Sequence, residues 1–538
     1  MAAQARQALA QFTALRVRHQ NVMLPGIFHR DYLPLAGSAA TDWEGGLARE
    51  LGRGQPDAAL ALATSMAREA GQGVEYYQRY QQTALTHLIR AAYLGCLASH
   101  AAQLGSAGEA MGRASRAWRG AVRAGAWMAA GAAGLSWLCQ KLPWHFLLYY
   151  LAPVLVWSRA AWLLATRSFP ASRPGPAVLL LALQVIATLL LLRQTFFQRC
   201  WLSVGLVVCL APLAALPRPG PAPPRSLPLL WLACLACLAV FPWLAPVDGR
   251  AAHPGLVLLT GLTTTAAALH LLPSPAWLSL GPSLASFTVA STAWLGTTTL
   301  PAQLATWLLF CGALPAAVWG SRPHYRERGP ALCLALTTQY LTLSLSYEAV
   351  FLPVLCLAMA LWAHMEDTLQ HKKNDHFGEF LRVNRGGKTM KTRVTLQDVS
   401  CILSFLFIIV YSFFATGNIA SLNSFDPSAI RCFVSVFSPF LMGGLLLVKI
   451  LIPFLVASLF FIQIIWFRGC DFPLVMNVLQ LFCDFLGLLF FDLVQSTGSW
   501  LDIGTSLSHF VIVEGTTILI VILLHIAAMI SKLNIKVL

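Results

Sequence analysis

Apolar stretches of about 20 residues, the length that an α-helix needs to cross a bilayer, follow one another from residue 84 to the end of the chain. Short polar breaks separate them. The stretches begin near Ala84, Ala121, His145, Ala177, Trp201, Leu227, Gly255, Leu284, Pro301, Ala331, Val350, Val399, Cys432, Leu451, Pro473 and His509. Because some of them are expected to be half-spans or re-entrant, the pattern predicts an all-α polytopic membrane protein with roughly 12–15 transmembrane helices.

The first 83 residues have a different pattern, in which acidic side chains recur in an Ala-rich background that favours helices. These acidic residues are Asp31, Asp42, Glu44, Glu50, Asp57, Glu69 and Glu75. Residues 1–12 have no unbroken apolar run of the kind that an export signal needs, and Arg6 interrupts them. Residues 1–83 are therefore predicted to form a short, helical, water-exposed segment before the membrane.

Composition excludes a purely soluble protein. Hydrophobic residues make up 57% of the chain and charged residues only 11%, against about 25% charged residues in ordinary soluble domains. A mean hydropathy of +0.65 means more apolar side chains than the cores of soluble domains can bury, so the remaining ones must face lipid. The net charge of +15 indicates basic cytosolic loops. The sequence contains no recognisable nucleic-acid-binding motif, so this charge does not indicate nucleic-acid binding. Membrane lipids, and no nucleic acid, are the expected partners.

The positions of the basic residues predict the orientation of the chain. Residues 113–123 contain four arginines, and residues 369–398 contain seven lysines and arginines. The positive-inside rule places both segments in the cytosol, which places residues 1–83 and the segment after residue 415 in a lumen. The predicted organisation is a helical luminal linker (1–83), the N-terminal part of a transmembrane domain (84–368), a basic cytosolic loop (369–398) and the C-terminal part of that domain (399–538). Alternatively, the basic loop is a patch that binds a membrane surface or a partner, on the same side.

Two polar clusters interrupt the C-terminal part. In residues 417–426, Asn418, Asn423 and Asp426 are natural turn and cap formers, so a capped luminal loop is one interpretation. The sharper interpretation is a polar bowl in which these three side chains bind lipid head groups or sugars. In residues 498–509, Trp500 suits a membrane interface, and Asp502 and Ser506 can cap the last helix. His509 would be the first residue of that helix. The side of this second cluster depends on whether residues 432–467 cross the membrane twice or form one broken element.

Ionisable residues at bilayer depth are costly and therefore suggest function. Glu348, Lys449 and Asp484 are the candidates. Glu348 lies between two apolar stretches, which favours an interfacial position, and Lys449, just before Pro453, is expected to snorkel or to mark a helix break. Asp484 and Asp492 are eight residues apart, so they could share a helix face without touching. An ion-coupled transport site is the alternative interpretation.

No pattern in the chain indicates a catalytic centre. We find no metal-binding cluster beside a Ser or Thr nucleophile, no phosphate-cradling Gly loop and no Ser-His-Asp arrangement. No catalytic residue, metal ligand or cofactor is therefore assigned to this chain.

The two polar clusters carry a specific resemblance. Residues 415–426, ATGNIASLNSFD, and residues 498–509, GSWLDIGTSLSH, are similar to segments of the GPI ethanolamine phosphate transferases. Residues 437–443 and 449–454 also look like that family. Two segments nearer the N-terminus resemble it as well, namely Tyr347-Glu348-Ala349-Val350-Phe351 and the Tyr-rich residues 73–80. The resemblance is strong after about residue 399 and thinner before it.

The resemblance implies a membrane enzyme of the endoplasmic reticulum that moves phosphoethanolamine from phosphatidylethanolamine to the first mannose of a GPI precursor. Its chemistry would reside in an alkaline-phosphatase-like luminal domain with a Thr nucleophile and paired divalent metal ions. Because this chain resembles only the membrane part of such an enzyme, it is expected to position lipids and to be inactive alone. Phosphatidylethanolamine, the GPI precursor and a luminal catalytic domain or full-length enzyme are the implied partners. A polytopic lipid or small-molecule transporter and a non-catalytic regulatory subunit are the alternatives.

Overall fold

The computed structural model describes residues 2–22, 31–35, 39–105, 116–140, 142–165, 176–210, 226–244, 252–271, 276–296, 298–321, 325–367, 395–416, 430–436 and 438–532. Helices dominate these ranges, and none of them contains a β-strand. The chain forms two compact units, Met1–Phe169 (unit 1) and Pro170–Leu538 (unit 2). The predicted all-α class is therefore confirmed.

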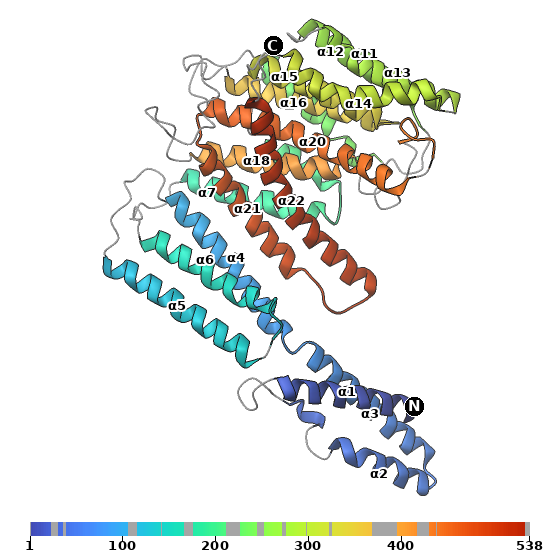
Figure 1. Ribbon diagram of the computed structural model, residues 1–538, viewed down its shortest axis with the longest axis vertical. Helices are drawn as coiled ribbons and strands as arrows, with labels where there is room; N and C mark the ends of the chain where they lie inside the picture. The colour runs from blue at the N-terminus through green and yellow to red at the C-terminus, as the bar shows by residue number, and fades with distance from the viewer. Residues whose placement is uncertain are drawn as a thin grey trace. The chain divides into compact units, whose positions relative to one another are not determined.

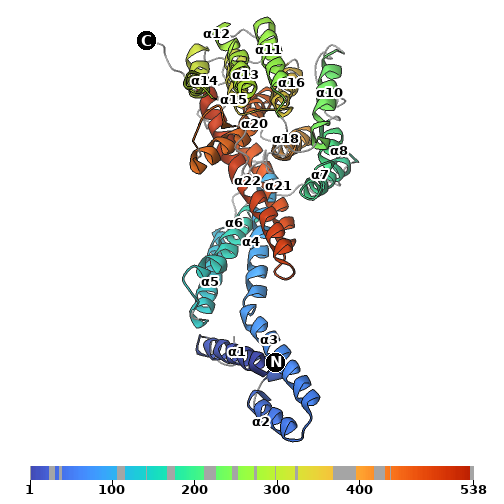
Figure 2. The same ribbon diagram turned by 90° about the vertical axis from the view of Figure 1, so that its right-hand side faces the viewer.

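Unit 1 begins with three helices, α1 (Ala2–Val22), α2 (Ala39–Gly52) and α3 (Pro56–Gln78), with a 3-10 turn, η1 (Leu33–Leu35), between the first two. α1 and α2 both pack on α3 (Figure 2). Phe12 of α1 is buried against Tyr32 and Tyr77. The Tyr77 hydroxyl donates to Asp31, and burial is the main cause that raises the pKa of Tyr77. Helices thus occupy the predicted N-terminal segment and enclose a small core of their own.

A glycine on α3 allows α1 to approach closely. A Cβ atom added at Gly73 would lie 2.5 Å from Cδ2 of Phe12, whereas one added at Gly71 would meet nothing within 4 Å. We expect Gly73→Ala to destabilise the α1–α3 packing by about 1–3 kcal/mol through overpacking. Gly71→Ala, the matched control, should be neutral or stabilising because Ala favours helix. Limited trypsin cleavage at Arg16 and Arg18 of the full chain measures the effect; equal cleavage rates in the two variants would contradict this packing.

Three further helices complete unit 1: α4 (Gln82–Gly105), α5 (Arg116–Cys139) and α6 (Phe146–Ala165). α6 packs along both α4 and α5 (Figure 1). Trp157 of α6 donates from Nε1 to the carbonyl of Ala91 over 2.9 Å, and Ser99 donates to the carbonyl of Val156. These contacts fix α6 against α4. The predicted boundary near residue 83 falls at the junction of α3 and α4.

Unit 2 contains the remaining elements. They are α7 (Pro176–Thr195), α8 (Trp201–Gly205), η2 (Leu206–Leu210), α10 (Ser226–Leu238), η3 (Phe241–Trp243), α11 (Pro254–Leu271), α12 (Ala276–Ser279), α13 (Gly281–Leu295), α14 (Leu300–Gly320), α15 (Tyr325–Thr342), α16 (Glu348–Asp367), α18 (Leu396–Phe414), α20 (Pro439–Arg468), α21 (Phe472–Asp492) and α22 (Trp500–Lys532). Residues 177–192 contain no proline, so the sequence predicts one unbroken helix there, and α7 covers them. The repeated prolines of residues 216–227 predict a connecting loop, which lies largely outside the described residues.

Eight of the described helices are long and apolar enough to cross a membrane, so the chain is a multi-pass membrane protein. They begin at Phe146, Ser226, Leu300, Glu348, Leu396, Pro439, Phe472 and Trp500. Eight spans among the described residues are fewer than the 12–15 expected from sequence. One reason is that α20 (Pro439–Arg468) runs through most of the stretch that begins near Cys432 and on into the stretch that begins near Leu451. Another reason is that several apolar stretches, such as residues 201–210, form shorter helices.

Helices α18 and α20 form the buried centre of unit 2. They run antiparallel, because Phe405 stacks on Phe461 and Phe413 stacks on Phe454. Fourteen residues of α18, including charged Asp398, are buried. α21 and α22 form a second antiparallel pair (Figure 1), in which Phe491 contacts Phe510. The start of α20 therefore lies at the same end as the finish of α18.

Candidate functional site

One end of unit 2 gathers the polar segments. α18 finishes there and α20 begins there, with residues 415–438 between them. The connection between α21 and α22, residues 493–499, lies at the same end, because Phe196 contacts both Phe414 of α18 and Phe490 of α21. We call this end, comprising residues 415–416, 430–436 and 493–499, the polar end. Because α20 is one continuous helix, residues 493–499, where the second polar cluster begins, lie at the end of unit 2 where α18 finishes.

A buried ion pair joins α16 and α20. The Nζ atom of Lys449 lies 2.8 Å from Oε1 of Glu348, and both residues are almost fully buried, at 3% and 2% exposure. The backbone N–H of Leu345 also donates to Oε1 of Glu348 over 3.1 Å. Burial removes both charged groups from water, which costs free energy. The charge-assisted hydrogen bond between them offsets this cost, so each group depends on the presence of the other.

Both sequence interpretations of these residues are corrected by the structure. The sequence favours an interfacial position for Glu348 and a snorkelling side chain or a helix break at Lys449; instead both residues are buried in protein and paired. α20 continues through Pro453. Because proline has no N–H, Pro453 removes the helix hydrogen bond that would end on the Lys449 carbonyl. Sequence could not show the pairing, because the two residues are 101 positions apart and lie on different helices.

The ion pair adjoins the segment that comes after residues 417–429. Ala349, next to Glu348, belongs to one apolar cluster with Cys432, Phe433 and Leu446, which lies one helical turn before Lys449. Trp307 donates from Nε1 to the carbonyl of Phe433 over 3.1 Å, which fixes this segment against α14. Residues 430–436, which follow the first polar cluster, are therefore packed beside the Glu348–Lys449 pair.

The structure places only some of the predicted site residues. Asn418, Asn423 and Asp426 lie outside the described residues, so their part in a polar bowl stays a prediction. Trp500 is 92% exposed at the first position of α22. Asp502 lies on the first turn of that helix, where its N–H donates to Ser499 Oγ and its carboxylate accepts from the Ser499 hydroxyl. Ser499, which sequence reasoning did not assign, is thus the capping residue.

His509 and Asp484 occupy separate surroundings. His509 lies on α22 rather than at its start, and its ring contacts Phe196, Phe197 and Phe490. Asp484 lies on α21, which packs mainly on α22, α18 and α7. Of the three candidates at bilayer depth, the structure thus pairs Glu348 of α16 with Lys449 of α20 and places Asp484 on another helix.

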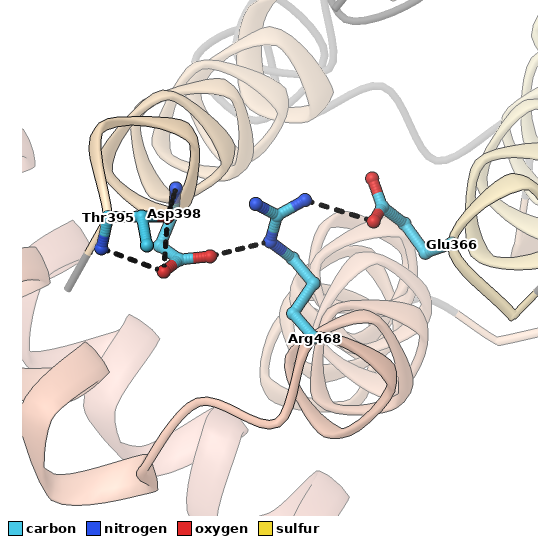
Figure 3. A network of polar contacts seen from close by, with 4 residues as sticks. All are labelled: Glu366, Thr395, Asp398 and Arg468. Carbon is cyan, nitrogen blue, oxygen red and sulfur yellow. Dashed lines mark hydrogen bonds and ion pairs between the residues drawn. The ribbon is translucent and has the colours of Figure 1, made fainter. Parts of the chain in front are cut away.

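A second buried charge cluster lies at the opposite end of α20 (Figure 3). Arg468 donates from Nη1 to Glu366 over 2.9 Å and from Nε to Asp398 over 2.8 Å. The Asp398 carboxylate also accepts from the N–H and hydroxyl of Thr395, which caps α18 reciprocally. Arg468 thus joins the end of α16 to the start of α18, on either side of residues 368–394. Sequence reasoning missed this cluster, although the Thr395-x-x-Asp398 capping box is readable.

The described residues contain no group of three or more His, Cys, Asp or Glu side chains that could hold a metal ion. Their polar chemistry is that of buried ion pairs, helix caps and an exposed aromatic residue. Such an arrangement orders helix ends. We assign none of the described residues to a bond-making step.

Comparison with known proteins decides the family. The model of the family Phosphatidylinositolglycan class N (PIG-N) matches residues 72–499, which include the first polar cluster and both buried charge clusters. The chain belongs to this family. The human protein named GPI ethanolamine phosphate transferase 1 is 31% identical over 437 residues, which cover 74% of this chain and 45% of the human protein. The mouse protein of the same name is 30% identical over 427 residues, covering 73% and 45%.

A fungal PIG-N relative shows a shorter match. The Schizosaccharomyces pombe protein named GPI ethanolamine phosphate transferase 1 is 32% identical over 213 residues, or 39% of this chain and 22% of that protein. The chain spans 45% of the length of its human and mouse relatives. No solved structure matches it significantly.

Proposed function

We propose that this chain acts in GPI-anchor biosynthesis in the endoplasmic reticulum membrane, as the membrane part of an ethanolamine phosphate transferase. Its role is to position phosphatidylethanolamine and a GPI precursor for transfer of phosphoethanolamine to the precursor's first mannose. The observation that carries this proposal is the PIG-N family match over residues 72–499, together with relatives named GPI ethanolamine phosphate transferase 1.

The polar end supports a positioning role. Both proposed substrates are lipids, so their head groups lie at a membrane surface and their reacting atoms must meet there. Holding two reactants in place is a large part of catalysis. At the polar end, residues 430–436 follow the first polar cluster and lie beside the buried Glu348–Lys449 pair, and residues 498–499 begin the second cluster.

The bond-making chemistry is proposed to come from a luminal catalytic domain or a full-length enzyme. The family resemblance implies divalent metal ions for that chemistry, and the described residues of this chain do not fit such a site. We therefore derive no metal-dependent step here and propose no cofactor for the described residues.

Recovery of the acceptor lipid tests the positioning role. Cells without the endogenous transferase should accumulate GPI precursor that lacks the modification, and the chain purified from them should carry that precursor at several times its share of total lipid. Mass spectrometry of co-purified lipids measures this enrichment, with an unrelated polytopic protein of the same membrane as control. Recovery of bulk lipids in the same proportions as the control would contradict the proposal.

A further inference from the structure

A surface groove on unit 1 lies between α2 and α3. Its volume is about 680 Å³, which is within the range of ligand sites on proteins. A short turn joins the two helices, so they are antiparallel neighbours. Phe12 of α1 packs against Tyr77, near the other end of α3, and none of the described residues of α1 lines the groove. The groove is therefore a face of the α2–α3 pair that α1 leaves accessible.

Both walls of the groove follow one face of a helix. The lining positions recur at intervals of three and four residues on each side, as side chains on one helix face do. They include Gly46, Arg49 and Arg53 on the side of α2 and Ala58, Ala61 and Ser65 on α3. Each wall thus covers two helical turns, or about 10 Å along the helix axis. A groove of this shape suits a third helix laid along the other two.

The bottom of the groove is built from small residues. Ala58 and Ala61 are exposed there, and Gly46 has no side chain at all. Small residues at a helix contact let another helix approach closely, because the distance between two packed helices depends on the side chains between them. The apolar side chains of a ligand helix would therefore reach the bottom of the groove.

Two arginines give the groove a positive rim. Arg53 pairs with Glu50 over 2.9 Å, and its side chain is still 66% exposed. Arg49 is exposed and donates from Nε to the carbonyl of Gly45 over 3.2 Å. No carboxylate in the described part of the chain forms an ion pair with Arg49. Because Glu50 is the one acidic residue that lines the groove among the described residues, the rim carries a net positive charge.

Shape and charge together indicate the chemistry of the occupant. A guanidinium binds a carboxylate through two parallel hydrogen bonds, and opposite charges across an interface favour the matching partner over a like-charged one. A lone phosphate ion would use the arginines and leave the apolar bottom of the groove uncovered. A helix with apolar side chains on one face and acidic side chains beside them uses both features.

We propose that this groove binds an acidic amphipathic helix of a protein partner, with apolar side chains over Ala58 and Ala61 and carboxylates on Arg49 and Arg53. The inference goes beyond the proposed function, because it needs neither lipid substrate nor transfer. It can therefore fail while the acceptor-lipid experiment succeeds, and the reverse.

The test measures binding of two fluorescein-labelled model peptides to the purified full chain in detergent by fluorescence anisotropy. Both are 16-residue helices with leucines on one face; one has glutamates beside that face and the other has lysines. The acidic peptide should bind about tenfold more tightly, because it complements the positive rim. Equal binding of the two peptides, or no binding of the acidic one, would overturn the proposal.

A charge reversal assigns the preference to the groove. Arg49→Glu should weaken binding of the acidic peptide about tenfold and tighten binding of the lysine peptide, because the sign of the rim changes. A general loss of structure would weaken both. Arg18→Glu is the matched control: it makes the same charge change at an exposed position of α1 that does not line the groove, and it should leave both affinities within twofold. If Arg49→Glu and Arg18→Glu have equal effects, the proposal is wrong.

A second variant tests the bottom of the groove. Ala61→Phe should fill it and weaken binding of the acidic peptide several-fold, whereas Ala48→Phe, at an exposed position of α2 that does not line the groove, should not. Binding that is unchanged in Ala61→Phe would contradict the proposal. Native mass spectrometry covers the remaining occupant: a dimer of the chain that Ala61→Phe converts to a monomer would show that the groove holds a second copy instead, which would also overturn it.

Discussion

Lys449→Met is expected to destabilise unit 2 by about 3–5 kcal/mol, because it leaves the buried Glu348 carboxylate without a counter-ion. Lys449 and Glu348 are buried at 3% and 2% exposure and lie 2.8 Å apart, so water cannot replace the lost partner. The methionine keeps the apolar length of the lysine side chain, and the loss therefore reports the charge. Reversible unfolding of the purified chain in mixed detergent micelles, titrated with SDS and followed by circular dichroism, measures the change.

The double variant Glu348→Gln with Lys449→Met is the control for this prediction. It removes both charges, and replacement of a whole buried ion pair by groups of similar shape is often close to neutral. Most of the lost stability should therefore return. If the double variant is as unstable as Lys449→Met, the loss comes from packing and the ion pair is not what holds α16 to α20.

Arg468→Gln is expected to cause a loss of similar size, about 3–5 kcal/mol, at the other end of α20. Arg468 contacts Glu366 and Asp398 at 2.9 and 2.8 Å, so the variant leaves two carboxylates buried with no cation between them. The start of α18 should open first, because Asp398 also completes the cap with Thr395. Hydrogen exchange of the amides of residues 396–400 in the full chain measures this opening.

Arg468→Lys separates charge from geometry at this site. Lysine restores a positive charge, but its compact ammonium cannot reproduce the planar fork that reaches two carboxylates in different directions. Protection of residues 396–400 should be intermediate between wild type and Arg468→Gln. Protection that is unchanged in Arg468→Gln would show that the cluster does not hold the ends of α16 and α18 together.

Much of the fold was predictable because it depends on local apolar patterns. The start of α18 follows from the Thr395–Asp398 capping box, and α7 follows from an apolar run without proline. The extent of α20 was less predictable. Pro453 suggests a break, but the helix loses only one hydrogen bond there and packing on α18 and α16 keeps it continuous. From the sequence alone, Lys449 is expected to snorkel, because its partner Glu348 cannot be recognised there.

The charge clusters were hidden from sequence for a different reason. Arg468 stands at the end of an apolar run, where it resembles an ordinary cytosolic flanking residue. Its partners Glu366 and Asp398 lie 102 and 70 residues away on other helices. Such contacts are set by helix packing, whereas the resemblance at residues 415–426 and 498–509 could identify the family directly.

Complementation tests the central claim, that this chain is the lipid-positioning membrane part of an ethanolamine phosphate transferase, most directly. The chain would be expressed in cells without the endogenous transferase, alone or with the part of the human relative that this chain does not cover. Phosphoethanolamine on the first mannose of GPI precursors would be measured by mass spectrometry. The account predicts transfer only when the two are expressed together, and a loss of that transfer with Lys449→Met. Transfer by the chain alone, or none by the combination although both parts are stable and in the endoplasmic reticulum, would contradict it.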